Sequence, residues 1–88
     1  MREFKHVVKD KNGLHARPAG LLAMASKSFE SEIKVYANGK EADGKRLLSL
    51  MSLGVKCGTE ISFKIEGADE EAAEKALIQH CNEKLNGE

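Results

Sequence analysis

The segment that most constrains this chain is a regular alternation of polar and apolar residues from Thr59 to Glu66. Successive side chains of a β-strand point to opposite faces, so the alternation predicts a strand whose Ile61, Phe63 and Ile65 face a core. A strand with one apolar face requires neighbouring strands and a layer that covers that face. We therefore expect residues 59–66 to form a central strand of a sheet.

Three other segments predict the remaining strands. Residues 2–8 and 32–37 alternate in the same way, and residues 40–43 are short and charged, as suits the edge of a sheet. Asn38-Gly39 lies between the last two segments and predicts a two-residue hairpin, because both positions tolerate positive φ. The side chains expected to face inward are Phe4, His6, Val8, Ile33, Val35 and Ala37.

Three segments predict helices. Residues 16–28 carry apolar side chains at helical spacing, and residues 46–53 form a short helix that ends at Gly54. Asp69 is a good N-cap for a last helix that runs to about Lys84, before Asn86-Gly87. The expected buried residues are Pro18, Leu21, Leu22, Ala25 and Phe29 in the first helix and Ala73, Ala76, Leu77, His80 and Cys81 in the last.

The order of these elements defines the expected fold. It is α/β (α+β), an open-faced β-sandwich in which a four-stranded antiparallel sheet carries three helices on one face. The 88 residues are expected to form one domain, 1–88.

The short helix 46–53 has more large apolar residues than one face can bury. Leu50 and Leu53 share one side, whereas Leu47, Leu48 and Met51 share another. If the first pair faces the core, the other three form an exposed apolar patch of the kind that marks a docking site. The alternative is that the helix is sunk deeper and all five residues belong to the core.

The composition excludes several classes of protein. Apolar residues make up 41% and charged residues 32%, as in a folded globular chain. Lys+Arg and Asp+Glu both number 14, which argues against nucleic acid as a partner. No apolar run is long enough to insert into a membrane, and the first residues lack the apolar core of a signal peptide, so we expect a cytoplasmic protein. Cys57 and Cys81 lack metal-type spacing and are expected to be free thiols.

The stretch from Asn12 to Gly20 carries the candidate chemistry. It predicts a loop that ends at His15, followed at once by a helix with Pro18 in its first turn. Histidine is a poor N-cap, so the amides of Ala16 and Arg17 are left without a partner. A phosphate on His15 satisfies them, because a helix N-terminus binds anions, and Arg17 can close on the same phosphate. We therefore interpret His15 as a reversibly phosphorylated nucleophile.

Other residues around His15 are assigned more simply. The helix N-terminus and Arg17 both disfavour the imidazolium, so the neutral ring is the expected nucleophile. No carboxylate stands beside His15 in the sequence to act as a proton relay, and carriage of a phosphate requires none. Asn12 either orients the ring or phosphate or caps the loop. His6 is interpreted as a partly buried strand residue rather than a metal ligand, and no metal or cofactor is expected.

The motifs together resemble one family over essentially the whole chain. His15-Ala16-Arg17-Pro18, Met51-Ser52-Leu53-Gly54, Gly67-Ala68-Asp69-Glu70 and the chain length resemble HPr, the histidine-containing phosphocarriers of the bacterial sugar phosphotransferase system. The resemblance implies a carrier rather than an enzyme. It implies that His15 takes a phosphoryl group on Nδ1 from phospho-enzyme I, which phosphoenolpyruvate charges, and passes it to enzyme IIA domains.

The same resemblance implies that Arg17 steadies the phosphate and that Leu47, Leu48 and Met51 form the partner surface. From the residues themselves, we expect Ala16 and Asn12 to lie beside the phosphate, and Gly20 and Arg46 to belong to the partner surface. We also expect a monomer. Many Gram-positive members of the family carry a regulatory serine at the position of Arg46, where a kinase phosphorylates it. Because this chain has arginine there, regulation by phosphorylation at this position is not expected. Ser49 and Ser52 are nearby, but no feature of the sequence identifies either as a replacement.

Two alternatives stay open at this point. One is a regulatory module that binds a transcriptional regulator or an enzyme through the same patch, for which an intact His15 is not needed. The other is a nitrogen- or stress-branch paralogue of the same carrier.

Overall fold

Four strands form one antiparallel sheet in the computed structural model, which describes residues 1–85. The order across the sheet is β1-β4-β2-β3. The strands are β1 (Arg2–Val7), β2 (Glu32–Ala37), β3 (Lys40–Asp43) and β4 (Glu60–Glu66). The alternating segment is thus a central strand, and the short charged strand lies at the edge, as predicted.

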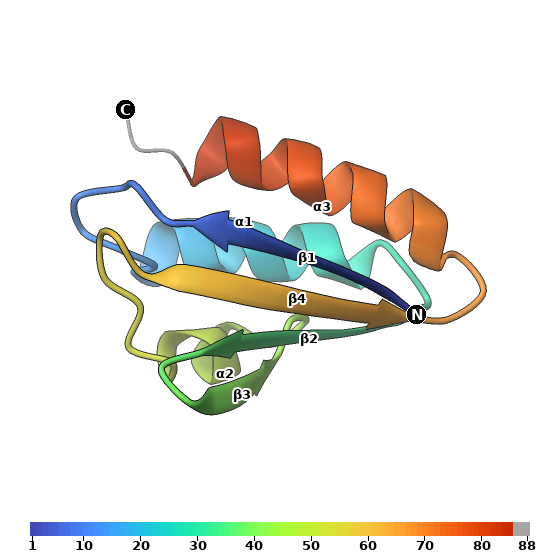
Figure 1. Ribbon diagram of the computed structural model, residues 1–88, viewed down its shortest axis with the longest axis horizontal. Coiled ribbons are helices and arrows are strands. Elements are labelled where there is room, and N and C mark those ends of the chain that lie inside the picture. The colour runs from blue at the N-terminus through green and yellow to red at the C-terminus, as the bar shows by residue number, and fades with distance from the viewer. Residues whose placement is uncertain (86–88) are drawn as a thin grey trace.

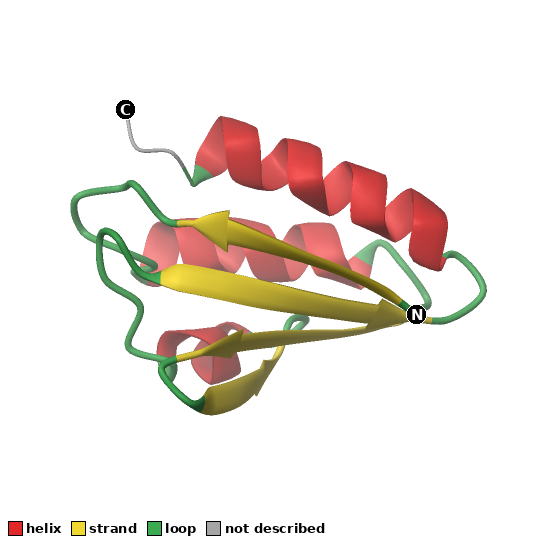
Figure 2. Cartoon of the chain, in the orientation of Figure 1, coloured by secondary structure: helices red, strands yellow, loops and turns green. Residues whose placement is uncertain are grey.

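Three helices pack against the sheet: α1 (Ala16–Lys27), α2 (Leu47–Met51) and α3 (Glu70–Lys84). Figure 1 and Figure 2 show α1 and α2 behind the sheet, and α3 lies alongside α1 and β1. The predicted open-faced sandwich and its element order are confirmed. Asn86-Gly87 lies outside the described residues.

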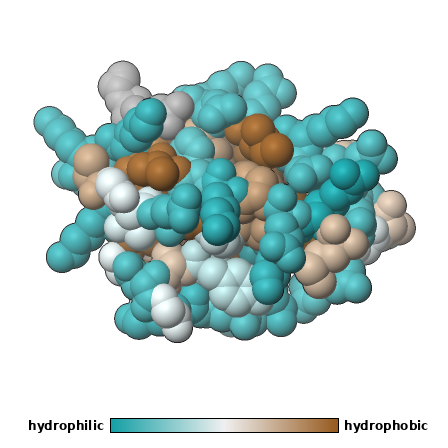
Figure 3. Space-filling view, viewed as in Figure 1, coloured by the Kyte–Doolittle hydropathy of each residue, from teal (hydrophilic) through white to brown (hydrophobic). Residues whose placement is uncertain are grey.

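The core lies between the sheet and the helices. Phe63 of β4 is fully buried at its centre, and its ring stacks on Phe4 of β1 with centroids 4.5 Å apart. The other face of the sheet is open and polar: Lys34 forms ion pairs with Glu32 and Glu41, and the space-filling view of this face is mostly hydrophilic (Figure 3). Among residues 1–85, no helix combines the length and the apolar character needed to cross a membrane.

The prediction that Leu21 belongs to the buried face of α1 is wrong, because 40% of this residue is exposed. The buried residues are Pro18, Ala19, Leu22, Ala23 and Ser26. Ala19 and Ala23 have small side chains, which let the helix approach its neighbours closely. The face that contains these two alanines therefore packs on the core, and Leu21 is left on the exposed side of the helix. Ala25 and Phe29 are partly buried against the core, as expected.

The inner face of α3 follows an i, i+4 row. Ala73, Leu77 and Cys81 are fully buried, and His80 is half-buried, as predicted. Ala76 is exposed, contrary to the prediction, because the fully buried residues of α3 follow the i, i+4 row of Ala73, Leu77 and Cys81, and Ala76 lies outside that row. Both cysteines are free: Cys57 is exposed, and burial raises the pKa of the Cys81 thiol to about 12.

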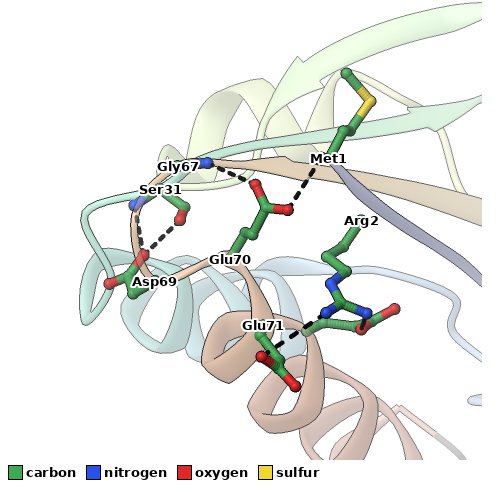
Figure 4. Close-up of polar contacts among 8 residues, drawn as sticks. Met1, Arg2, Ser31, Gly67, Asp69, Glu70 and Glu71 are labelled. Carbon is green, nitrogen blue, oxygen red and sulfur yellow. Dashed lines mark hydrogen bonds and ion pairs between the residues drawn. The ribbon is translucent and has the colours of Figure 1, made fainter.

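Asp69 occupies the N-cap position of α3, but its side chain does not cap that helix. Its carboxylate accepts hydrogen bonds from the backbone N–H of Glu30 and of Ser31, both at 2.9 Å, and from the Ser31 hydroxyl. These contacts join the β4–α3 connection to the α1–β2 connection, and Figure 4 shows those between Asp69 and Ser31. The Ser31 hydroxyl, followed by the Glu30 N–H, lowers the pKa of Asp69 below its ordinary value.

Candidate functional site

The loop before α1 is held in place by backbone contacts. The N–H of Gly13 donates to the carbonyl of Asp10 at 2.8 Å, and the N–H of Leu14 donates to the carbonyl of Val55 at 3.1 Å. Gly13 has a φ of +68°, and a Cβ at this position would lie 2.2 Å from the Val55 carbonyl oxygen. Only glycine fits here, so the turn fixes where the chain enters the helix.

His15 is the N-cap of α1, as predicted. Its backbone is extended, with φ −89° and ψ −172°, and its side chain makes no capping hydrogen bond. The imidazole is 41% exposed. Within residues 1–85, the N–H groups of Ala16 and Arg17 donate to no protein acceptor. An exposed ring therefore stands beside two unsatisfied donors at the positive end of a helix, which is a site for an anion attached to that ring.

Arg17 and Asn12, two and three positions from His15 in the sequence, have side chains without a hydrogen bond or ion pair among residues 1–85. Arg17 is exposed and forms no ion pair there, so its guanidinium is available to an anion. Asn12 is exposed, and its backbone N–H donates to the Asp10 carboxylate at 2.9 Å. The side chain that caps this turn is therefore that of Asp10, not that of Asn12.

Asp10 is a site residue that the sequence reasoning missed. No carboxylate is adjacent to His15 in the sequence, and Asp10 lies five positions earlier. The turn brings the Asp10 Oδ2 atom to 3.8 Å from the His15 Nε2 atom. The signal was available in the sequence, because aspartate at the first position of a turn followed by glycine at the fourth is a common pattern.

The apolar patch on α2 has the geometry expected from the helical wheel. Leu50 and Leu53 are fully buried, whereas Leu48 is 80% exposed, with Leu47 and Met51 at 38% and 40%. The alternative of a sunken helix with all five residues in the core is wrong, because Leu47, Leu48 and Met51 are exposed.

A groove joins this patch to the histidine end of α1. Its volume is about 460 Å³, and its lining includes Arg17, Gly20, Leu21, Met24 and Lys27 from α1 and Leu47 from α2. Met24 is 67% exposed. Leu21 and Met24 were missed as surface residues, although positions 17, 20, 21 and 24 repeat at helical spacing and so share a face with Arg17.

The remaining predicted residues lie in or next to α1 and α2. Gly20 lines the groove, and a Cβ there would meet no atom within 4 Å. Arg46 is the exposed N-cap of α2, next to Leu47. The Ser49 hydroxyl accepts the Asp43 N–H at 2.8 Å, and the Ser52 hydroxyl donates to the Ser49 carbonyl at 2.6 Å. Among residues 1–85, no three His, Cys, Asp or Glu side chains gather in a way that could hold a metal ion.

Comparison with known proteins identifies the family. Residues 2–83 match the family model described as PTS HPr component phosphorylation site. The phosphocarrier protein HPr of Mycoplasma genitalium is 46% identical over 85 residues, which is 96% of each chain. HPr-C-His from Thermoanaerobacter tengcongensis has a TM-score of 0.91 at 40% identity, and the match covers 100% of this chain and 99% of that one. This chain belongs to the HPr phosphocarrier family of the phosphotransferase system, whose members carry a phosphoryl group rather than catalyse a reaction.

A solved structure of a catabolite repression protein is also similar to this chain. Crh, the Bacillus subtilis catabolite repression protein, matches with a TM-score of 0.74 at 35% identity, over 97% of this chain and 98% of that one. Its structure is a dimer with a swapping domain.

Proposed function

We propose that this chain accepts a phosphoryl group on His15 from phospho-enzyme I and passes it to enzyme IIA domains during sugar uptake. The observation that carries the proposal is the exposed imidazole at the N-cap of α1, beside the two unsatisfied amides of Ala16 and Arg17. Membership of the HPr family supports a role in the phosphotransferase system. We also propose that the protein acts as a monomer in the cytoplasm.

The proposed chemistry needs little machinery. The lone pair on the Nδ1 atom of His15 attacks phosphorus, and the transferred group brings about two negative charges to the helix end. The partial positive charge of the helix N-terminus and the guanidinium of Arg17 both favour that charge. The two free amides lie beside the ring before the phosphate arrives, so little reorganisation accompanies the transfer.

The proposed docking surface is the groove with the patch beside it. It consists of Gly20, Leu21, Met24, Arg46, Leu47, Leu48 and Met51. Apolar side chains that stay exposed in the free protein gain from burial in a complex, and Arg17 borders them. The groove also includes Ala16, the residue directly after His15, so a donor seated there lies next to the histidine end of α1.

Mass spectrometry after incubation with phosphoenolpyruvate and enzyme I tests the proposal. We expect a gain of one phosphoryl group that is labile in acid and absent from the His15→Ala variant. His6→Gln is the control, because His6 lies on β1 and should leave the gain unchanged. Phosphate that persists on His15→Ala, or that survives acid, contradicts the proposal.

The likeness to Crh supports one alternative, a regulatory module that binds its partner through the same groove. The two functions differ in one measurement. A carrier passes its phosphate on to an isolated IIA domain, whereas a module that acts by binding alone does not need His15. The exposed ring favours the carrier.

A further inference from the structure

The carboxylate of Asp10 is held with one oxygen on the backbone and the other toward His15. Its Oδ1 atom accepts the N–H of Asn12 at 2.9 Å, and its backbone carbonyl accepts the N–H of Gly13 at 2.8 Å. Its Oδ2 atom lies 3.8 Å from the Nε2 atom of His15. The Asp10 side chain is 22% exposed, so the turn places a largely covered carboxylate against one particular ring nitrogen.

We propose that Asp10 is a positioning residue that keeps the proton of His15 on Nε2 and so leaves the lone pair on Nδ1. The inference rests on the proposed function of His15 and extends it. A neutral imidazole has one N–H and one lone pair, and an acceptor that faces one nitrogen favours the tautomer with the proton there. At 3.8 Å the contact is longer than a hydrogen bond, and the negative charge of the carboxylate favours an N–H over a lone pair on the ring nitrogen that it faces, in the free protein as well as in a complex.

The transfer leaves the Nε2 proton in place. The lone pair on Nδ1 forms the N–P bond while the bond from phosphorus to the donor's leaving atom breaks, and that electron pair stays with the donor. The ring of His15 then carries the phosphoryl group on Nδ1 and the proton on Nε2, and its positive charge faces the Asp10 carboxylate. In the onward step the N–P bond breaks, its electron pair returns to Nδ1, and the ring recovers its first tautomer.

The Asp10→Asn variant separates this role from the role of Asp10 in the turn. The amide oxygen can still accept the Asn12 N–H, so the turn is kept. The amide NH₂ then faces the ring nitrogen, and as a donor it favours a lone pair on Nε2 and a proton on Nδ1. Asp10→Ser also keeps an acceptor for the turn but places nothing against the ring.

Ring ¹⁵N NMR of His15 reads the tautomer in the whole protein without any partner. We expect the Nδ1–H form to increase in Asp10→Ser and to increase further in Asp10→Asn. Single-turnover phosphorylation by phosphoenolpyruvate and enzyme I should slow by about threefold to tenfold, a modest factor because both side chains are partly exposed. Asp43→Asn is the matched control, because Asp43 accepts the Lys45 N–H at 2.9 Å in the same kind of turn, away from the ring.

The outcomes distinguish this inference from the proposed function. A wild-type tautomer ratio in folded Asp10→Asn overturns the role of Asp10, whatever happens to the phosphate. An equal shift in Asp43→Asn overturns it as well. If the wild-type protein takes up no phosphate while the tautomer shifts as expected, the proposed function fails and the placement of the proton by Asp10 stands.

Discussion

At the scale of single residues, Gly13 fixes the loop that leads to His15. Gly13 and Gly39 both have positive φ, at +68° and +75°, but their surroundings differ. A Cβ at position 13 meets the Val55 carbonyl at 2.2 Å, whereas a Cβ at position 39 meets nothing within 4 Å. Substitution of Gly39 therefore tests backbone strain alone, whereas substitution of Gly13 tests strain together with steric crowding.

We expect Gly39→Ala to lower the free energy of unfolding by about 1 kcal/mol, the cost of a left-handed alanine. Gly13→Ala should cost about 3 kcal/mol or more, because overpacking adds to that strain. It should also slow phosphorylation of His15, since the loop must move away from Val55. Urea unfolding and the phosphorylation assay measure both effects. Equal stability losses at the two positions would show that the contact with Val55 does not matter.

At the scale of elements, α1 has two faces with different tasks. Leu22 is fully buried, whereas its neighbour Leu21 is 40% exposed and lines the groove. We expect the buried face to contribute to stability and the exposed face to docking, and the adjacent leucines allow both expectations to be tested with the same chemical change.

Leu22→Ala should lower the free energy of unfolding by about 2–5 kcal/mol, because it leaves a cavity in the core. Leu21→Ala should change stability by less than about 1 kcal/mol but raise the KM for enzyme I by about fivefold to tenfold. Thermal unfolding and initial rates of phosphorylation check the pair. A Leu21→Ala variant with the wild-type KM would remove α1 from the proposed docking surface.

At the scale of the whole molecule, Asp69 joins connections that are far apart in the sequence. Its carboxylate binds residues 30 and 31, and these hydrogen bonds lower its pKa in the folded state. A carboxyl group with a lowered folded pKa stabilises the protein above its unfolded pKa. That contribution is lost as the pH falls through the folded pKa.

We therefore expect Asp69→Asn to be less stable than the wild type at pH 7, and the gap between them to shrink below about pH 4. Urea midpoints measured for both proteins from neutral to acid pH give the gap directly. Glu70, whose pKa is also lowered, first by the N–H of Gly67, is present in both proteins and cancels in the comparison. A gap that stays constant with pH would mean that the ionised carboxylate is not what joins the two connections.

Local patterns in the sequence determined the elements and the place of His15 at the N-cap of α1. Alternation in β4, the Asn38-Gly39 hairpin and the run from His15 to Pro18 are short-range features, and they were predicted because each depends on residues within one turn or strand. Tertiary packing alone decided the rotation of α1, which exposes Leu21, and the placement of Asp69 against Ser31. It also decided the approach of Asp10 to the ring of His15. These features depend on which distant segments pack against one another. The spacing of residues along the sequence does not specify those contacts.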